Sequence, residues 1–147
     1  MARKRGLDAL FLNVSFVGSE ALLAELGDQA SGVIVTQVVP PPDVDLPAVK
    51  AYVTALSGTK PTFGSLEGYL AAKAFAEGLR RAGPEPTREG FIDALDAARD
   101  FDIGLGQTHS LSRDEHQISH KVWPTIIRDG SFHSFKWRDL QQAKLTH

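Results

Sequence analysis

Apolar residues recur at helical spacing over residues 65–82, the longest segment whose start, body and end agree. Ser65 is a suitable N-cap, and Gly83 followed by Pro84 ends the helix. One side of the helical wheel carries residues that we expect to be buried: Tyr69, Ala71, Ala72, Phe75, Ala76, Leu79 and Ala82. The other side carries Lys73, Glu77, Arg80 and Arg81. Because the apolar side is rich in alanine, another element must approach it closely.

Two short apolar segments, residues 7–14 and 32–39, are predicted to be buried strands. A helix over residues 19–26 is predicted between them, with Ser19 as its cap. A strand, a helix and a strand in this order predict one βαβ unit, with parallel strands and a right-handed crossover.

Ligands bind beyond the carboxyl ends of the strands in open parallel sheets. That rule places residues 15–18 and 40–43 at a candidate binding edge. The prolines at 40–42 continue neither a helix nor a strand ladder, because proline lacks the amide hydrogen. We interpret them as a stiff crossing between two bodies of the fold.

Two more helices are predicted after the prolines. The first covers residues 46–56, with Asp45 as its cap, and the second extends from its cap Thr87 to residue 99. Both have one apolar face, which we expect to pack against other elements.

A hairpin is predicted near the end of the chain. The dipeptide Asp129-Gly130 is a strong signal for a two-residue turn, and it lies between apolar segments 122–128 and 131–135. A brief strand is also predicted over residues 101–103.

These elements predict an α/β fold whose parallel sheet is incomplete, because a doubly wound sheet usually needs five or six strands. We divide the chain into a βαβ segment (1–39), a helical segment (40–100), a return segment with the hairpin (101–136) and a tail (137–147). The helices are expected to cover strands that the chain does not supply. Large apolar patches rarely stay uncovered, so we expect self-association.

Charge and composition remove several function classes. The chain has 16 basic and 18 acidic residues, which gives no electrostatic footprint for nucleic acid or for a membrane surface. It has no cysteine, so it cannot form disulfides or thiolate metal sites. The basic start and the apolar run after it imitate a secretion signal, but Asp8 and Asn13 interrupt the run. We therefore expect no signal peptide in this chain.

Three histidines, His109, His116 and His120, are close together in the sequence. In a helix, His116 and His120 would share one face, as zinc ligands require. Glu115 precedes His116, however, so the HExxH order is absent. We interpret all three as solvated loop histidines and keep a small metal-binding enzyme as an alternative function.

Other signals for catalysis or cofactors are weak. Gly104-x-Gly106 neither follows a clear strand nor opens a helix, so we predict no dinucleotide cofactor. No GxSxG elbow surrounds Ser15, so we do not interpret it as a nucleophile. None of these patterns therefore identifies a catalytic site.

Four segments also match a known pattern in order and spacing. They are GVIVTQVVPPP, PTFGSLEGYLAAKAFAEGLRRAG, PTREGFIDALD, and FDIGLG with the later HQISHKVWPTIIRDGSF. Together they resemble the carboxyl-terminal part of type I periplasmic solute-binding proteins of the leucine/isoleucine/valine-binding family, over residues 2–135.

The resemblance implies two α/β lobes joined by three crossings, with an amino acid or similar small solute held between them. It places residues 7–39 in the second lobe, makes 40–42 a crossing, and assigns the three helices to the first lobe. For a full-length parent it implies a periplasmic location and, as partners, the membrane subunits of an ABC importer.

The resemblance also implies a ligand site. An acidic residue just ahead of the GVxVT-like strand receives the ligand's ammonium group in this family, and Asp28 falls on that position. Aspartate replaces a longer acid there. Ser15 and Phe16, in the loop after the first strand, also face the cleft.

The family's first-lobe strands, which hold the ligand's carboxylate, are expected ahead of residue 1. We therefore expect this chain alone to bind amino acids weakly or not at all. A third hypothesis is a dimeric interaction module that has kept this part of the fold.

Overall fold

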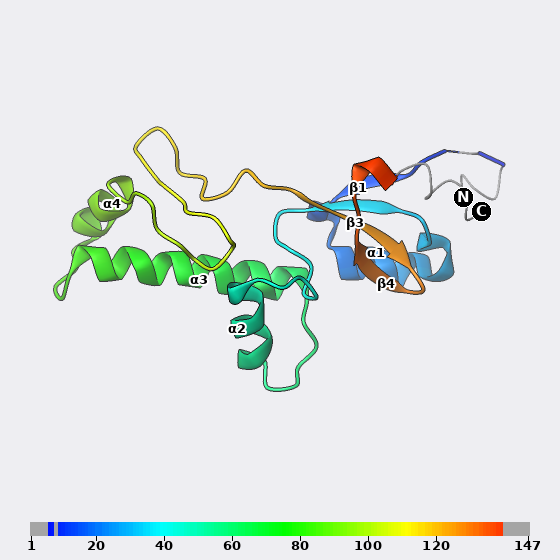
Figure 1. The fold of residues 1–147 in the computed structure, drawn as a ribbon, viewed down its shortest axis with the longest axis horizontal. Helices are drawn as coiled ribbons and strands as arrows, with labels where there is room; N and C mark the ends of the chain where they lie inside the picture. The colour runs from blue at the N-terminus through cyan, green and yellow to red at the C-terminus, as the bar shows by residue number, and fades with distance from the viewer. Residues whose placement is uncertain (1–5, 8, 140–147) are drawn as a thin grey trace. The chain divides into compact units, whose positions relative to one another are not determined.

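The computed structural model describes residues 6, 7 and 9–139 (Figure 1). The chain divides into two compact units, one formed by Met1–Pro41 with Val122–His147 and the other by Pro42–Lys121. The first boundary therefore lies within the three prolines. In the predicted tail, Trp137–Asp139 form the 3-10 helix η4, and residues 140–147 lie outside the described residues.

The first unit contains a four-stranded sheet in the order β1-β2-β3-β4. Its strands are β1 (Leu12–Val14), β2 (Ile34–Gln37), β3 (Trp123–Arg128) and β4 (Ser131–Ser134). β1 pairs with β2 in parallel, whereas β2 with β3 and β3 with β4 are antiparallel. The βαβ unit and the hairpin are confirmed, in a sheet that is mixed.

The hairpin turn has the geometry that its sequence predicts. Asp129 has φ 48° and Gly130 has φ 67°, so both central residues lie in the left-handed region. A two-residue turn of this kind matches the twist of the strands it joins, and it fixes their register. Arg128 consequently lies opposite Ser131.

The central strands are buried on both faces. Ile34 and Ile126 pack on one face with Phe135. On the other face, Val35 and Ile127 form a core on which helix α1 (Ser19–Leu26) packs (Figure 1). This double burial explains why Val33, Ile34 and Val35, at the start of β2 and just before it, are three consecutive apolar residues.

The first strand is shorter and more exposed than predicted. Residues 7–14 were expected to be buried, but only Leu12–Val14 form β1. Leu12 is 53% exposed and Val14 is 51% exposed. The physical reason is that β1 lies at the edge of the sheet and pairs on one side only.

The second unit contains three consecutive helices: α2 (Pro47–Ala55), α3 (Phe63–Ala82) and α4 (Arg88–Asp96). Thr87 caps α4 as predicted, because its hydroxyl accepts a hydrogen bond from the Gly90 amide at 3.0 Å. The predicted cap of α3 was wrong. Thr62 caps that helix and accepts from the amide of Ser65, at 3.2 Å.

Two other helix ends also differ from the prediction. Asp45 does not cap α2 but forms an ion pair with Lys50 at 2.7 Å. α4 ends at Asp96 rather than at residue 99. The Arg99 side chain folds back and donates to the Asp96 carbonyl at 2.9 Å, which satisfies an oxygen that the helix leaves unpaired.

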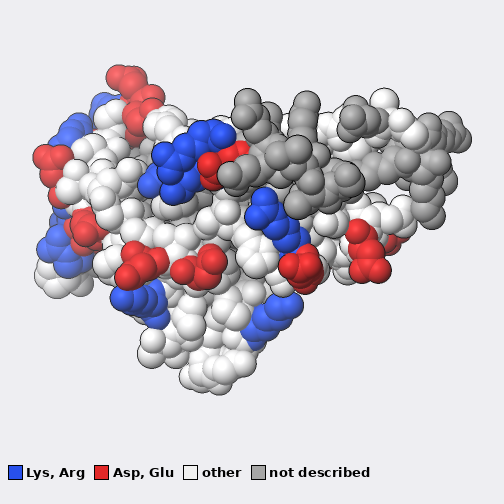
Figure 2. Space-filling model, turned by 45° about the vertical axis from the view of Figure 1, so that its right-hand side comes forward, with Lys and Arg blue, Asp and Glu red and all other residues white. Residues whose placement is uncertain are grey.

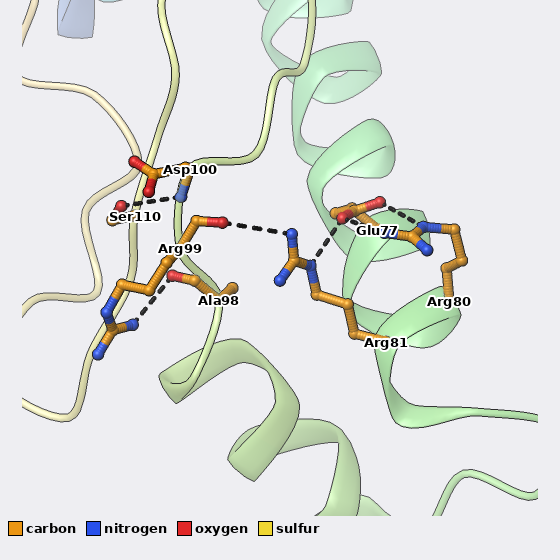
Figure 3. A network of polar contacts seen from close by, with 7 residues as sticks. All are labelled: Glu77, Arg80, Arg81, Ala98, Arg99, Asp100 and Ser110. Atoms are coloured by element: carbon orange, nitrogen blue, oxygen red, sulfur yellow. Dashed lines mark hydrogen bonds and ion pairs between the residues drawn. The ribbon is translucent and has the colours of Figure 1, made fainter.

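Glu77 holds the last turn of α3 in a small polar network (Figure 3). Its carboxylate accepts hydrogen bonds from Nε of Arg80 at 2.8 Å and from Nε of Arg81 at 2.7 Å. Arg81 also donates to the carbonyl of Arg99 at 3.4 Å, which ties α3 to the segment after α4.

The apolar side that we expected α3 to bury lies exposed. The buried residues of this helix are Phe63, Leu66, Leu70, Ala74 and Gly78. On the predicted inner side Phe75 is 55% exposed and Leu79 36% exposed, and the three alanines at 71, 72 and 76 are exposed as well. Among the described residues, α4 contacts this side at Phe75, whose ring centroid lies 5.0 Å from that of Phe91, and most of the side stays exposed.

The segment after α4 forms no regular strand where one was predicted at residues 101–103. Instead, Phe101 and His109 form an isolated bridge with two backbone hydrogen bonds, of 3.0 and 2.7 Å. His109 is buried, and its Nδ1 donates to the Ile118 carbonyl at 2.7 Å. The prediction of a solvated loop histidine was therefore wrong for His109.

Candidate functional site

The carboxyl ends of the two parallel strands define a candidate binding edge. β1 ends at Val14, and the 3-10 helix η2 (Ser15–Val17) follows directly. Gly18, at φ 74°, then reverses the chain, and its amide donates to the Ser15 carbonyl at 3.0 Å. α1 begins at the next residue. A tight turn therefore holds Ser15 and Phe16 beyond the end of β1.

A buried polar pair fixes this turn beside the neighbouring strand. Ser19 was predicted to cap α1, but Gly18 occupies the cap position and the Ser19 side chain makes no capping bond. The Ser19 hydroxyl instead pairs with the side-chain amide of Gln37, with Nε2 to Oγ at 2.7 Å. Both residues are buried. Because Gln37 ends β2, the pair joins the start of α1 to the carboxyl end of β2.

Exposed apolar side chains follow directly after the two parallel strands, at this candidate binding edge. Phe16 is 92% exposed, Val17 54% and Val38, directly after β2, 45%. Burying a phenylalanine side chain typically stabilises a protein by about 1.5–3 kcal/mol. A fully solvated phenylalanine at the edge where α/β folds bind ligands is therefore typical of a contact surface.

The structure does not bring Asp28 together with Ser15 and Phe16. Asp28 is exposed and lies in the 3-10 helix η3 (Gly27–Ala30), ahead of β2. Ser15 follows β1, and the eight residues of α1 separate the two positions. Since α1 leads back along the sheet for about 12 Å before β2 begins, Asp28 lies toward the amino ends of the two parallel strands.

Sequence reasoning passed over a different carboxylate. Glu20 lies in the first turn of α1, close to the Ser15–Gly18 turn, and is half-buried. An acidic residue at the start of a helix that directly follows a parallel strand lies at the carboxyl edge of the sheet. The position of Glu20 at the start of the helix after β1 could therefore have identified it as a candidate site residue from the sequence.

A hollow of about 490 Å³ lies in the helical unit, and His109, Glu115 and His120 are among its lining residues. Glu115 accepts from the Gln117 amide at 2.8 Å and contacts Nε2 of His120 at 3.1 Å. The pKa of Glu115 is lowered, first by the Gln117 amide and then by His120. Nε2 of His109 is buried and has no hydrogen-bond partner among the described residues.

The histidines do not form a metal site in the described part of the chain. His116 lies 3.7 Å from Asp96, whereas His120 lies beside Glu115, so the two histidines have different partners. No group of three or more histidine, cysteine or acidic side chains among the described residues is placed to hold a metal ion. The geometry therefore does not favour the metalloenzyme alternative.

The surface charges are mixed. Figure 2 shows lysine and arginine interspersed with aspartate and glutamate on the face that it displays, in keeping with the net charge of −2. None of the described helices has both the length and the apolar composition that crossing a membrane requires.

The sequence resemblance assigns the βαβ segment, the returning hairpin and the helical unit to a two-lobed α/β solute-binding protein. The family model described as periplasmic binding protein matches residues 1–131. This chain belongs to that family, whose full-length members are extracytoplasmic. The resemblance identified in the sequence is confirmed.

Solved structures agree with this assignment. A possible leucine/isoleucine/valine-binding protein from Rhodopirellula baltica is 40% identical, with a TM-score of 0.87, over 95% of this chain and 39% of its own. A substrate-binding periplasmic protein from Ralstonia solanacearum is 32% identical, with a TM-score of 0.73, over 85% of this chain and 37% of its own.

A branched-chain amino acid ABC transporter protein from Thermus thermophilus, solved with bound valine, shares the fold. It is 19% identical, with a TM-score of 0.68, over 92% of this chain and 40% of its own. The chain thus spans about two fifths of these proteins, which are binding proteins rather than enzymes. No curated protein matches it.

Proposed function

We propose that this chain is part of an extracytoplasmic receptor for branched-chain amino acids, which delivers its ligand to the membrane subunits of an ABC importer. The chain has no catalytic role in this proposal, and its full-length parent is periplasmic. Family membership and the 40% identity to the Rhodopirellula protein support the ligand class. The observation that carries the proposal is the solvated Phe16 side chain beyond the carboxyl end of β1, at 92% exposure.

Each residue of the binding edge has a chemical role in the proposal. The Phe16 ring contacts the apolar side chain of the amino acid, and contact with the ligand removes apolar surface from water. The Ser15 hydroxyl donates or accepts a hydrogen bond with a polar group of the ligand. The Ser19–Gln37 pair does not touch the ligand but holds the turn in place.

The identity of the acidic residue that binds the ligand's ammonium group is a prediction. The family resemblance gives this role to Asp28. Glu20, in the first turn of α1, directly follows the Ser15–Gly18 turn, whereas Asp28 follows the end of α1, and this order supports Glu20 as the alternative. If Asp28 binds the ammonium group, Asp28→Asn should weaken amino acid binding and Glu20→Gln should not. If Glu20 binds it, the reverse should hold, because only a carboxylate that touches the ammonium group contributes a charge-assisted hydrogen bond.

The isolated chain is expected to bind weakly. A site that contacts one side of a small ligand leaves most of the ligand's surface in water, whereas ligand pockets typically bury more than about 70% of it. We expect a dissociation constant of about 1 mM or weaker, which corresponds to roughly −4 kcal/mol.

A chimaera tests the proposal in a complete cleft. In it, this chain replaces the matching 39% of the Rhodopirellula relative, and titration calorimetry measures binding of leucine, isoleucine and valine. We expect an affinity within about tenfold of the unmodified relative. We also expect Phe16→Ala to weaken it at least about tenfold, since that is one lost contact of about 1.4 kcal/mol.

Phe75→Ala is the matched control, because Phe75 is also exposed but belongs to the helical unit. It should leave the affinity unchanged. A chimaera that folds but binds none of the three amino acids, while the relative binds, would refute the proposal. Equal effects of Phe16→Ala and Phe75→Ala would remove Phe16 from the site.

A further inference from the structure

Two exposed valines lie opposite each other at the candidate binding edge. Because β3 runs antiparallel to β2, it begins at the edge where β2 ends, and the last residues paired there are Gln37 and Trp123. Continuing this register by one residue places Val38 opposite Val122. Directly opposed residues on neighbouring strands have Cβ atoms about 4.5–5.5 Å apart, so the two side chains can form one apolar surface. We call these two residues the valine pair.

The valine pair lies on the face of the sheet opposite α1. Side chains alternate between the two faces along a strand. Gln37 is directed toward α1, because its side-chain amide bonds the Ser19 hydroxyl at 2.7 Å. Val38 is the next residue, so it lies on the other face, with Ile34. Ile34 is fully buried, whereas Val38 is 45% and Val122 58% exposed.

We infer that the valine pair forms a second apolar wall of the amino acid site, and that its occupant is the side chain of the ligand. This inference rests on the proposed function and concerns the same site. Phe16 lies in the turn that leads into α1, so it belongs to the other side of the strand ends. A ligand that binds beyond the carboxyl ends of β1 and β2 lies across the end of the sheet, where Phe16 contacts it from one side and the valine pair from the other.

The two walls together favour a long aliphatic side chain. They belong to three neighbouring strands, so they span two strand spacings, or about 10 Å. Leucine and isoleucine each have one methylene more than valine, and burying one more methylene tightens binding about fourfold. None of the three wall residues offers a side-chain hydrogen bond, so a polar ligand side chain would lose its bonds to water without replacement. The site should therefore prefer leucine and isoleucine to valine, and valine to polar amino acids.

The chimaera with the Rhodopirellula relative tests the second wall, and the ratio of two affinities is the measurement. By titration calorimetry, Val38→Ala and Val122→Ala should each weaken leucine binding at least about threefold and valine binding less than about twofold, because the longer side chain covers more of the pair. Val122→Thr should act in the same direction. Threonine keeps the β-branched shape of valine, so its effect would come from the hydroxyl group and not from altered folding.

Val53→Ala is the matched control, because it makes the same substitution at a residue that is 42% exposed but belongs to α2 in the helical unit. It should leave both affinities and their ratio unchanged. An equal effect of Val53→Ala and Val122→Ala on the ratio would overturn the inference.

Two other results would overturn the second wall and leave the proposed function intact. In the first, the chimaera binds leucine and responds to Phe16→Ala, but the variants of the valine pair keep the wild-type ratio. In the second, those variants lower the stability of the chimaera to urea and leave both affinities unchanged, which would assign the pair to packing against the rest of the fold. A chimaera that binds no amino acid would instead refute the proposed function, and the second wall with it.

Discussion

Replacing a helical glycine by alanine usually stabilises a protein, but the contact between α3 and α4 should make Gly78→Ala destabilising. Gly78 is a buried residue of α3, and helix α4 lies beside this helix (Figure 1). A Cβ atom there would lie 2.7 Å from Cε2 of Phe91 and 2.8 Å from Cδ2 of Leu95. The ring of Phe91 is also held by Phe75, with centroids 5.0 Å apart, so it has little room to move.

Two effects compete in Gly78→Ala. Alanine is the better helix former by about 1 kcal/mol. Inserting a methyl group into a close contact typically costs about 1–3 kcal/mol. Because both contacts are shorter than van der Waals separation, we expect the packing cost to be larger, with a net loss of about 1 kcal/mol. At Gly64, on the same helix, a Cβ would meet nothing within 4 Å. Gly64→Ala should therefore stabilise the chain, by about 0.5 kcal/mol.

Urea unfolding followed by far-UV circular dichroism measures both free energies, at a protein concentration low enough to keep the chain monomeric. The two variants should differ by about 1.5 kcal/mol, roughly a tenfold difference in the unfolding equilibrium constant. The reasoning fails if Gly78→Ala is as stable as Gly64→Ala, since α4 would then not pack on this glycine.

Two further substitutions test other contacts. Gly104→Ala should lower the free energy of unfolding by more than about 3 kcal/mol in the same assay. Gly104 has φ 88°, and an added Cβ would lie 2.8 Å from the Ala48 backbone nitrogen. A loss below about 1 kcal/mol would contradict this contact. The pKa of Glu77 is lowered from 4.5 to about 2 by hydrogen bonds first from Arg80 and then from Arg81. A lowered pKa stabilises the fold above pH 4.5, and the effect is lost as the pH falls toward 2. With screening by solvent, Glu77→Gln should cost about 1 kcal/mol at pH 7 and nothing near pH 2; a cost that does not change with pH would refute the network.

Local chemistry predicted several elements correctly. The Asp129-Gly130 turn and the Thr87 cap depend on residues within four positions of each other, so the sequence contains all the relevant information. The parallel pairing of β1 and β2 followed from the strand–helix–strand order of this segment. The cap of α3 was predicted three residues too late because Thr62 and Ser65 both carry a hydroxyl group that suits the position.

The incorrect predictions concern properties that depend on tertiary contacts, which the local sequence does not determine. The helical wheel of α3 identified an apolar side but not whether this chain covers it, so Phe75 was predicted to be buried and is exposed. Asp28 is adjacent in sequence to β2, yet adjacency does not tell which edge of the sheet a residue reaches. His109 seemed equivalent to its two neighbouring histidines, yet it is buried where it bridges to Phe101 and contacts the Ile118 carbonyl.

The most direct test of the ligand site is an NMR titration of the isotope-labelled chain with L-leucine. The account predicts saturable amide shifts at Ser15, Phe16 and Gly18, with a dissociation constant of about 1 mM or weaker. It also predicts that Phe16→Ala removes those shifts. Amides that do not move at this turn, or micromolar binding by the isolated chain at the hollow beside His109, would contradict it.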